Sequence, residues 1–119
     1  MNKFKKYGLY ASLGLVTFAF TAAGLAKLAG VEQMHVSFAA MGLPVWFGYF
    51  IGASELAGAI GIWVKKVSVL AVAGLMIVMS GAIYFHLVYE VLANAIPAFV
   101  LSILLLNILF NRLTERKTK

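Results

Sequence analysis

The sequence predicts an all-α fold, namely a polytopic membrane protein with four transmembrane helices in a bundle and a short interfacial helix between the first and second. The 119 residues are 63% hydrophobic and only 12% charged, with a mean hydropathy of +0.96. Four apolar stretches approach the roughly 20 residues that a spanning helix needs. Because these stretches use nearly the whole chain, we expect one domain, residues 1–119.

The predicted spans follow one another closely, and their order fixes the connections. Lys65 and Lys66 separate the second span from the third and leave almost no loop, so these two spans form a tight hairpin. In chain order the four predicted spans are Tyr7–Ala29, Val45–Trp63, Val67–Tyr89 and Ile96–Phe110.

The basic residues predict the orientation. Nine of the ten lie before the first span, between the second and third, or after the fourth, and Lys27 within the first span is the exception. Basic connections stay in the cytoplasm. We therefore expect both termini to be cytoplasmic, with the chain integral to the plasma (inner) membrane. The basic residues outside the spans are Lys3, Lys5, Lys6, Lys65, Lys66, Arg112, Arg116, Lys117 and Lys119.

The N-terminal pattern of lysines, apolar run and small residues also resembles a signal peptide. The apolar run is long for such a peptide, and Lys27 would be unusual in a discarded segment. We therefore expect this stretch to be retained as a span.

The connection from Gly30 to Pro44 alternates apolar and polar residues with a helical period. The pattern predicts a short amphipathic helix that lies in the outer interface of the membrane. Its apolar positions are Val31, Met34, Phe38 and Met41, and the polar positions between them are Glu32, Gln33, His35 and Ser37.

Small residues form a stripe on the second span. Helices in lipid approach closely where their side chains are small, so this stripe is expected to pack against another helix. Glu55 shares the stripe and therefore points toward a helix. The stripe comprises Gly48, Gly52, Glu55, Ala59 and Ile62, and Gly24, Gly74 and Gly81 on the other spans suit the same purpose.

Glu55 is the only acidic residue deep inside an apolar stretch. An ionisable group at that depth costs at least ~2.5–3.5 kcal/mol and is often functional. Other polar side chains fall in the outer half of the predicted bundle. The candidate ligand-binding residues are therefore Glu55, Lys27, His86, Thr21 and Ser80, and we predict no catalytic residue and no metal site.

Each candidate also has a structural interpretation. Lys27 marks the interface if its long side chain reaches to water. His86 can bond to Glu90, four residues later, instead of binding a ligand or carrying a proton. Glu55 can serve only to fix helix register. A height difference of about 10–15 Å, from a rise of about 1.5 Å per residue, argues against direct contact between Lys27 and Glu55. If they meet, the pair is charged; if not, Glu55 is expected to be protonated.

Three segments together resemble a known family. FTAAGLAKLAG (20–30), MGLPVWFGYFIGASELAGAIGIW (41–63) and SGAIYFHL (80–87), followed by a proline-led last span, are similar to the DoxX-like family of four-helix membrane proteins. The most specific parts are AGxxKL, with Lys27, and GxxELxG, with Glu55. The family includes a subunit associated with a thiosulfate:quinone oxidoreductase. The resemblance thus implies the fold and suggests a membrane subunit of a quinone-linked oxidoreductase.

We expect a non-catalytic accessory or binding subunit. Its partner is a membrane lipid, a quinone-like ligand, or another membrane protein such as a redox subunit. Cysteine is absent, which excludes disulfides, and any thiol-based redox role would need a second subunit. The net charge of +6 is explained by topology, so no nucleic acid is expected.

Two other functions compete with this one. The first is a small proton-coupled transporter or exchanger that uses Glu55. Small multidrug-resistance transporters are of similar length, but their glutamate lies in the first span and their charge bias is weak. The second is a stand-alone oxidoreductase, which the sequence disfavours. It lacks a glycine-rich dinucleotide turn, and its two histidines are too few and scattered for paired haem ligation.

Overall fold

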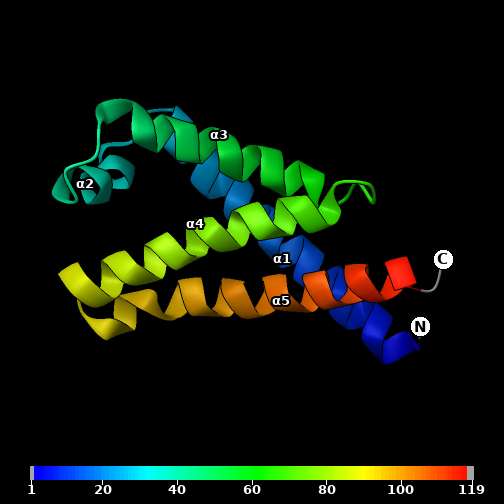
Figure 1. Cartoon of the computed structure of the whole chain (residues 1–119). Helices are drawn as coiled ribbons and strands as arrows, with labels where there is room; N and C mark the ends of the chain where they lie inside the picture. Colours follow the sequence, from blue (N-terminus) through cyan, green and yellow to red (C-terminus); the bar gives the residue numbers. More distant parts are fainter. Residues whose placement is uncertain (1, 118–119) are drawn as a thin grey trace.

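The computed structural model describes the backbone of residues 2–117 and the side chains of residues 2–115. The predicted all-α fold is confirmed (Figure 1). Lys119, which the orientation argument used, lies outside the described residues. The elements in chain order are α1 (Lys3–Leu28), α2 (Glu32–Ala40), α3 (Val45–Gly61), α4 (Ser68–Tyr89), the 3₁₀ turn η1 (Leu92–Ala95) and α5 (Ile96–Lys117).

The first and last helices are longer than the predicted spans because they continue into polar sequence. α1 begins at Lys3, where the Asn2 side chain accepts a hydrogen bond of 2.8 Å from the Lys5 backbone N–H. This cap satisfies one of the free N–H groups of the first turn. α5 continues past Phe110 to Lys117.

The helices differ in whether they are long and apolar enough to cross a membrane. α1, α4 and the stretch Leu92–Glu115 are each long and apolar enough to span a membrane. α3 has 17 residues, or about 25 Å at 1.5 Å per residue. It meets the same criterion only together with α2, and the two helices are bent by 119° where the chain breaks between them. The second span is thus a short helix with a separate, sharply turned helix before it.

The four long helices form a ring in which α1 packs on α3, α3 on α4, α4 on α5, and α5 on α1. Each turns one stripe of residues inward, at the three- and four-residue spacing of a helix face. The stripe of α1 includes Leu9, Leu13, Val16 and Phe20, all buried. These side chains meet those of α3, α4 and α5 in one apolar core, which also includes Ile62, Val72, Leu75, Leu105 and Ile108.

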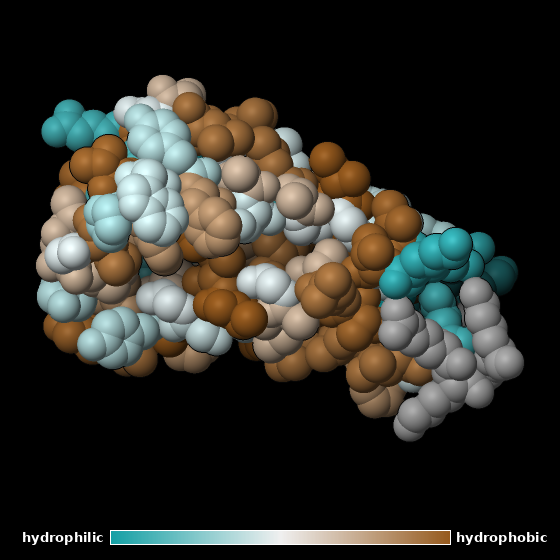
Figure 2. Space-filling view, turned by 45° about the horizontal axis from the view of Figure 1, so that its top comes forward, coloured by the Kyte–Doolittle hydropathy of each residue, from teal (hydrophilic) through white to brown (hydrophobic). Residues whose placement is uncertain are grey.

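The ring is closed at one end and divided at the other. α3 and α4 meet at their short connection and separate toward their opposite ends (Figure 1). At the divided end, α2 lies beside α3, and α4 and α5 form a second pair. Both termini lie at the closed end, together with the connection between α3 and α4. Figure 2 shows hydrophilic side chains at that end, mostly apolar ones over the middle of the face, and further hydrophilic ones at the divided end.

The small-residue stripe of α3 is buried, as predicted. A Cβ atom at Gly24 would lie 2.8 Å from the Gly52 carbonyl oxygen, so α1 and α3 are in backbone contact. The predictions for Gly74 and Gly81 are wrong, because a Cβ at either would meet nothing within 4 Å. Both lie off the inward stripe of α4. Gly58 of α3 makes the contact with α4 instead, since a Cβ there would lie 2.6 Å from the Leu75 side chain.

The amphipathic helix forms at the predicted place, as α2, and two glycines flank it. Gly30 and Gly42 have φ values of +78° and +75°, which glycine adopts readily and other residues do not. No residue of α2 is fully buried. His35, one of the polar positions of the predicted helix, is half-buried and directed to α1 and α3.

Candidate functional site

A buried ion pair joins α1 to α3. The Lys27 ammonium nitrogen lies 2.8 Å from Glu55 Oε1, and the two side chains are 11% and 2% exposed. The expectation that their heights would keep them apart is wrong. It assumed that the outer ends of the first and second spans lie at one level, but a Cβ at Gly52 would lie 2.7 Å from the Lys27 Cβ. Gly52 is seven residues into α3, so the last turn of α1 lies about 10 Å below the start of α3.

The contact is an ion pair without the geometry of a hydrogen bond. Glu55 Oε1 has no hydrogen-bond partner among the described residues. Burying two ions costs several kcal/mol each, and their attraction offsets that cost only when the geometry is excellent. Apolar side chains of similar size would stabilise this contact about as well. Stability alone therefore does not explain the pair.

His35 of α2 contacts the backbone of Lys27. Its Nε2–H donates at 2.8 Å to the Lys27 carbonyl oxygen in the last turn of α1, which also accepts from the Gly30 backbone N–H. The imidazole packs on the Tyr49 ring, with 4.6 Å between centroids. It also occupies the space above Gly48, where any side chain would collide with it. Sequence reasoning missed His35 as a site residue. The sequence signal for this contact was Gly48, because a residue without a side chain leaves room for an aromatic or imidazole ring of another element to lie against α3.

The other three predicted site residues do not meet the pair. Ser80 Oγ donates to the Met76 carbonyl oxygen at 2.9 Å on an exposed face of α4. His86 pairs with Glu90, as its structural interpretation predicted. Thr21 is half-buried on α1. The structure thus brings together Lys27 and Glu55 alone from the predicted set.

What the pair offers chemically is an ammonium group, that of Lys27, held in a fixed position. Among the described residues no group of three His, Cys, Asp or Glu side chains is placed to hold a metal ion. The ammonium has three N–H donors and its one polar contact among the described residues is with Glu55, so donors remain for an oxygen acceptor. Glu55 fixes where that ammonium lies. The arrangement can bind a carbonyl or phosphate oxygen at the α1–α3 contact, near the end of α1.

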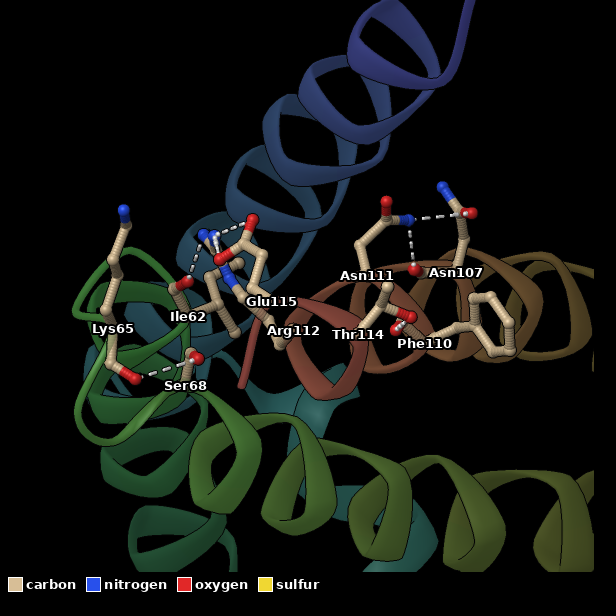
Figure 3. Close-up of polar contacts among 9 residues, drawn as sticks. All are labelled: Ile62, Lys65, Ser68, Asn107, Phe110, Asn111, Arg112, Thr114 and Glu115. Carbon is tan, nitrogen blue, oxygen red and sulfur yellow. Dashed lines mark hydrogen bonds and ion pairs between the residues drawn. The ribbon is translucent and has the colours of Figure 1, made fainter. Parts of the chain in front are cut away.

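A second buried cation lies at the closed end of the ring (Figure 3). The Arg112 Nη2 of α5 donates to the Ile62 carbonyl oxygen at 3.1 Å, and Nη1 lies 3.4 Å from a Glu115 carboxylate oxygen. Ile62 directly follows α3, so this contact satisfies a free carbonyl of the helix end. Sequence reasoning treated Arg112 only as a topological charge. The structure shows that it ties α5 to α3.

One comparison with known proteins identifies a family. The family model described as DoxX-like matches residues 11–108, which is more than half of the chain. The matched segment includes both Lys27 and Glu55. No curated protein and no solved structure matches the chain.

Proposed function

The chain belongs to the DoxX-like family of membrane proteins, and from that premise and the buried ion pair we propose that it is a non-catalytic binding subunit. It holds a membrane lipid or a quinone by the oxygen atoms of its polar head, and presents this molecule to another membrane protein, such as a redox subunit. The observation that carries the proposal is the pair of opposite charges between Lys27 and Glu55, beside which α2 is hydrogen-bonded to the Lys27 backbone.

The two charged residues have different roles in this proposal. Lys27 contacts the ligand, because an ammonium group is a donor that suits carbonyl and phosphate oxygens. Glu55 is a positioning residue. At 2% exposure it is too deeply buried to contact a molecule arriving from the outer side, but it sets the direction of the ammonium.

Access to Lys27 requires α2 to move. The helix has no fully buried residue, its one side-chain hydrogen bond to another helix among the described residues is that of His35, and glycines in the left-handed region lie at both of its ends. Few buried contacts characterise segments that open at low cost in free energy. We therefore assign α2 the role of the cover that opens to admit the ligand.

The test is ligand retention by Glu55→Gln. We expect native mass spectrometry of the wild-type protein, purified in mild detergent, to show a co-purified lipid or quinone, and Glu55→Gln to lose most of it. Glutamine keeps an oxygen that can accept from Lys27 but no longer holds it by charge, so folding should survive, as measured by thermal denaturation. Glu90→Gln is the matched control, because Glu90 pairs with His86 on α4 and lies outside the site.

Two outcomes would contradict the binding role. Equal retention by all three proteins would show that Glu55 has a structural role only. A wild-type protein without ligand that nevertheless moves a substrate across vesicles along a proton gradient, with loss of transport in Glu55→Gln, would show instead a proton-coupled transporter.

We also propose that both termini are cytoplasmic, which places Lys27 and α2 near the outer face. Single cysteines at Gln33, exposed on α2, and at Thr118, beyond the described residues, test this orientation. A membrane-impermeant thiol reagent applied to intact cells should label the first and spare the second. Labelling at Thr118 alone would invert the proposed orientation.

A further inference from the structure

A groove of about 580 Å³ lies between the start of α1 and the end of α5. It is separate from the ion pair, which lies between α1 and α3. Figure 3 shows Asn107 and Asn111 projecting from α5 on a different side from Arg112. The residues that line the groove include Phe4, Lys5, Gly8, Phe110, Asn111 and Thr114.

The lining suits a molecule with an apolar part and a negative polar part. Phe4 and Phe110 are 88% and 69% exposed and supply apolar walls. The Lys5 side chain has no partner among the described residues, and the carboxylate that lines the groove, Glu115, lies against Arg112. The Asn111 amide nitrogen donates to Asn107, which leaves its Oδ1 as an acceptor. The positive charge of Lys5 therefore favours a bound molecule whose polar part is negative.

The groove lies at the closed end of the ring, where the chain is most basic. Of the nine Lys and Arg residues whose backbone the structure describes, eight belong to that end of the molecule. A groove between two spanning helices at this level is filled by lipid or by another protein. A second copy in the same orientation would bring an equally basic end alongside, and like charges repel. Anionic lipids, in contrast, are attracted by about 1 kcal/mol per basic residue near the surface.

We infer that this groove binds one anionic phospholipid of the adjacent leaflet. An acyl chain lies along Phe4 and Phe110, the phosphate is bound by Lys5, and a headgroup hydroxyl donates to Asn111 Oδ1. The inference does not depend on the proposed function, because it uses none of the residues at the ion pair.

The experiment fills the groove without disturbing the fold. A Cβ at Gly8 would meet nothing within 4 Å, and Gly8 lines the groove, so we expect Gly8→Leu to be tolerated and to fill part of the groove. Gly14→Leu is the matched control, since Gly14 is an equally open position of α1 that does not line the groove. Lys5→Gln tests the lysine that lines the groove, and Lys6→Gln, at a neighbouring lysine that does not line it, is the control. The probe is dioleoyl phosphatidylglycerol, added to delipidated protein in detergent and counted by native mass spectrometry, with phosphatidylcholine as the neutral comparison.

We expect about a fivefold loss of phosphatidylglycerol affinity in Lys5→Gln, the factor that one lysine near an anionic headgroup contributes, and loss of the bound lipid in Gly8→Leu. Both control variants should bind like wild type, and glycerol 3-phosphate should not displace the lipid. Equal losses in Lys6→Gln would show diffuse attraction without a site. Unchanged binding in Gly8→Leu, equal binding of phosphatidylcholine, or a dimer that Gly8→Leu dissociates would each overturn the inference.

Discussion

Replacing Lys27 by methionine is expected to destabilise the protein by about 3–5 kcal/mol, the usual cost of removing one partner from a buried ion pair. Methionine preserves most of the apolar stem of the lysine and removes its charge. Glu55, 2% exposed, must then keep an unpaired charge among apolar groups or take up a proton. Thermal denaturation in mild detergent measures the loss, and Lys6→Met, at an exposed lysine of the same helix, should change the midpoint little.

The double variant Lys27→Met, Glu55→Leu removes both charges but keeps similar side-chain volumes, so it tests whether the fold depends on the charges of the pair or on the space that they fill. Replacement of a buried ion pair by apolar residues of similar volume is often neutral or stabilising. We expect the second substitution to restore most of the stability that the first removes, so that the two effects are strongly non-additive. Additive losses would show that the two side chains are not coupled, contrary to their distance of 2.8 Å. If the double variant regains stability but does not retain the ligand, the charged pair serves ligand binding and not the stability of the fold.

The sequence predicted the buried face of α3 correctly because small residues in a membrane helix mainly serve to let another helix approach closely. Gly48, Gly52, Glu55, Ala59 and Ile62 share a face by helical geometry, and all five are buried. The same reasoning failed for α4, where Gly74 and Gly81 are exposed. Isolated glycines do not define a face, whereas several at three- and four-residue spacing do.

The contact between Lys27 and Glu55 could not be predicted from span boundaries. Residue counting gives depth along one helix, but it does not give the offset between two helices. That offset is set here by Gly24 and Gly52, whose backbones meet and bring the end of α1 to the middle of α3. The inward direction of His35 was also hidden, because a short helix with mixed polarity can turn either side to its neighbours. Both features depend on packing between elements and not on any single segment.

Gly52→Leu is the second substitution with a large expected effect. A Cβ at this position would lie 2.7 Å from the Lys27 Cβ and 3.0 Å from the Gly24 carbonyl oxygen. Both obstacles are fixed close to the helix axis of α1, so the side chain cannot be accommodated by rotation alone. α1 and α3 must separate, at the roughly 1–3 kcal/mol or more that overpacking costs.

The separation also acts on the ion pair. Lys27 and Glu55 are held together by the close approach at Gly52, so Gly52→Leu should lower both the thermal midpoint and ligand retention. Gly74→Leu is the matched control, because it places the same side chain in a helix where a Cβ meets nothing within 4 Å. A leucine there gains helix propensity over glycine and should leave both measurements near wild type. Similar losses in the two variants would mean that the backbone contact between Gly24 and Gly52 does not set the position of Lys27.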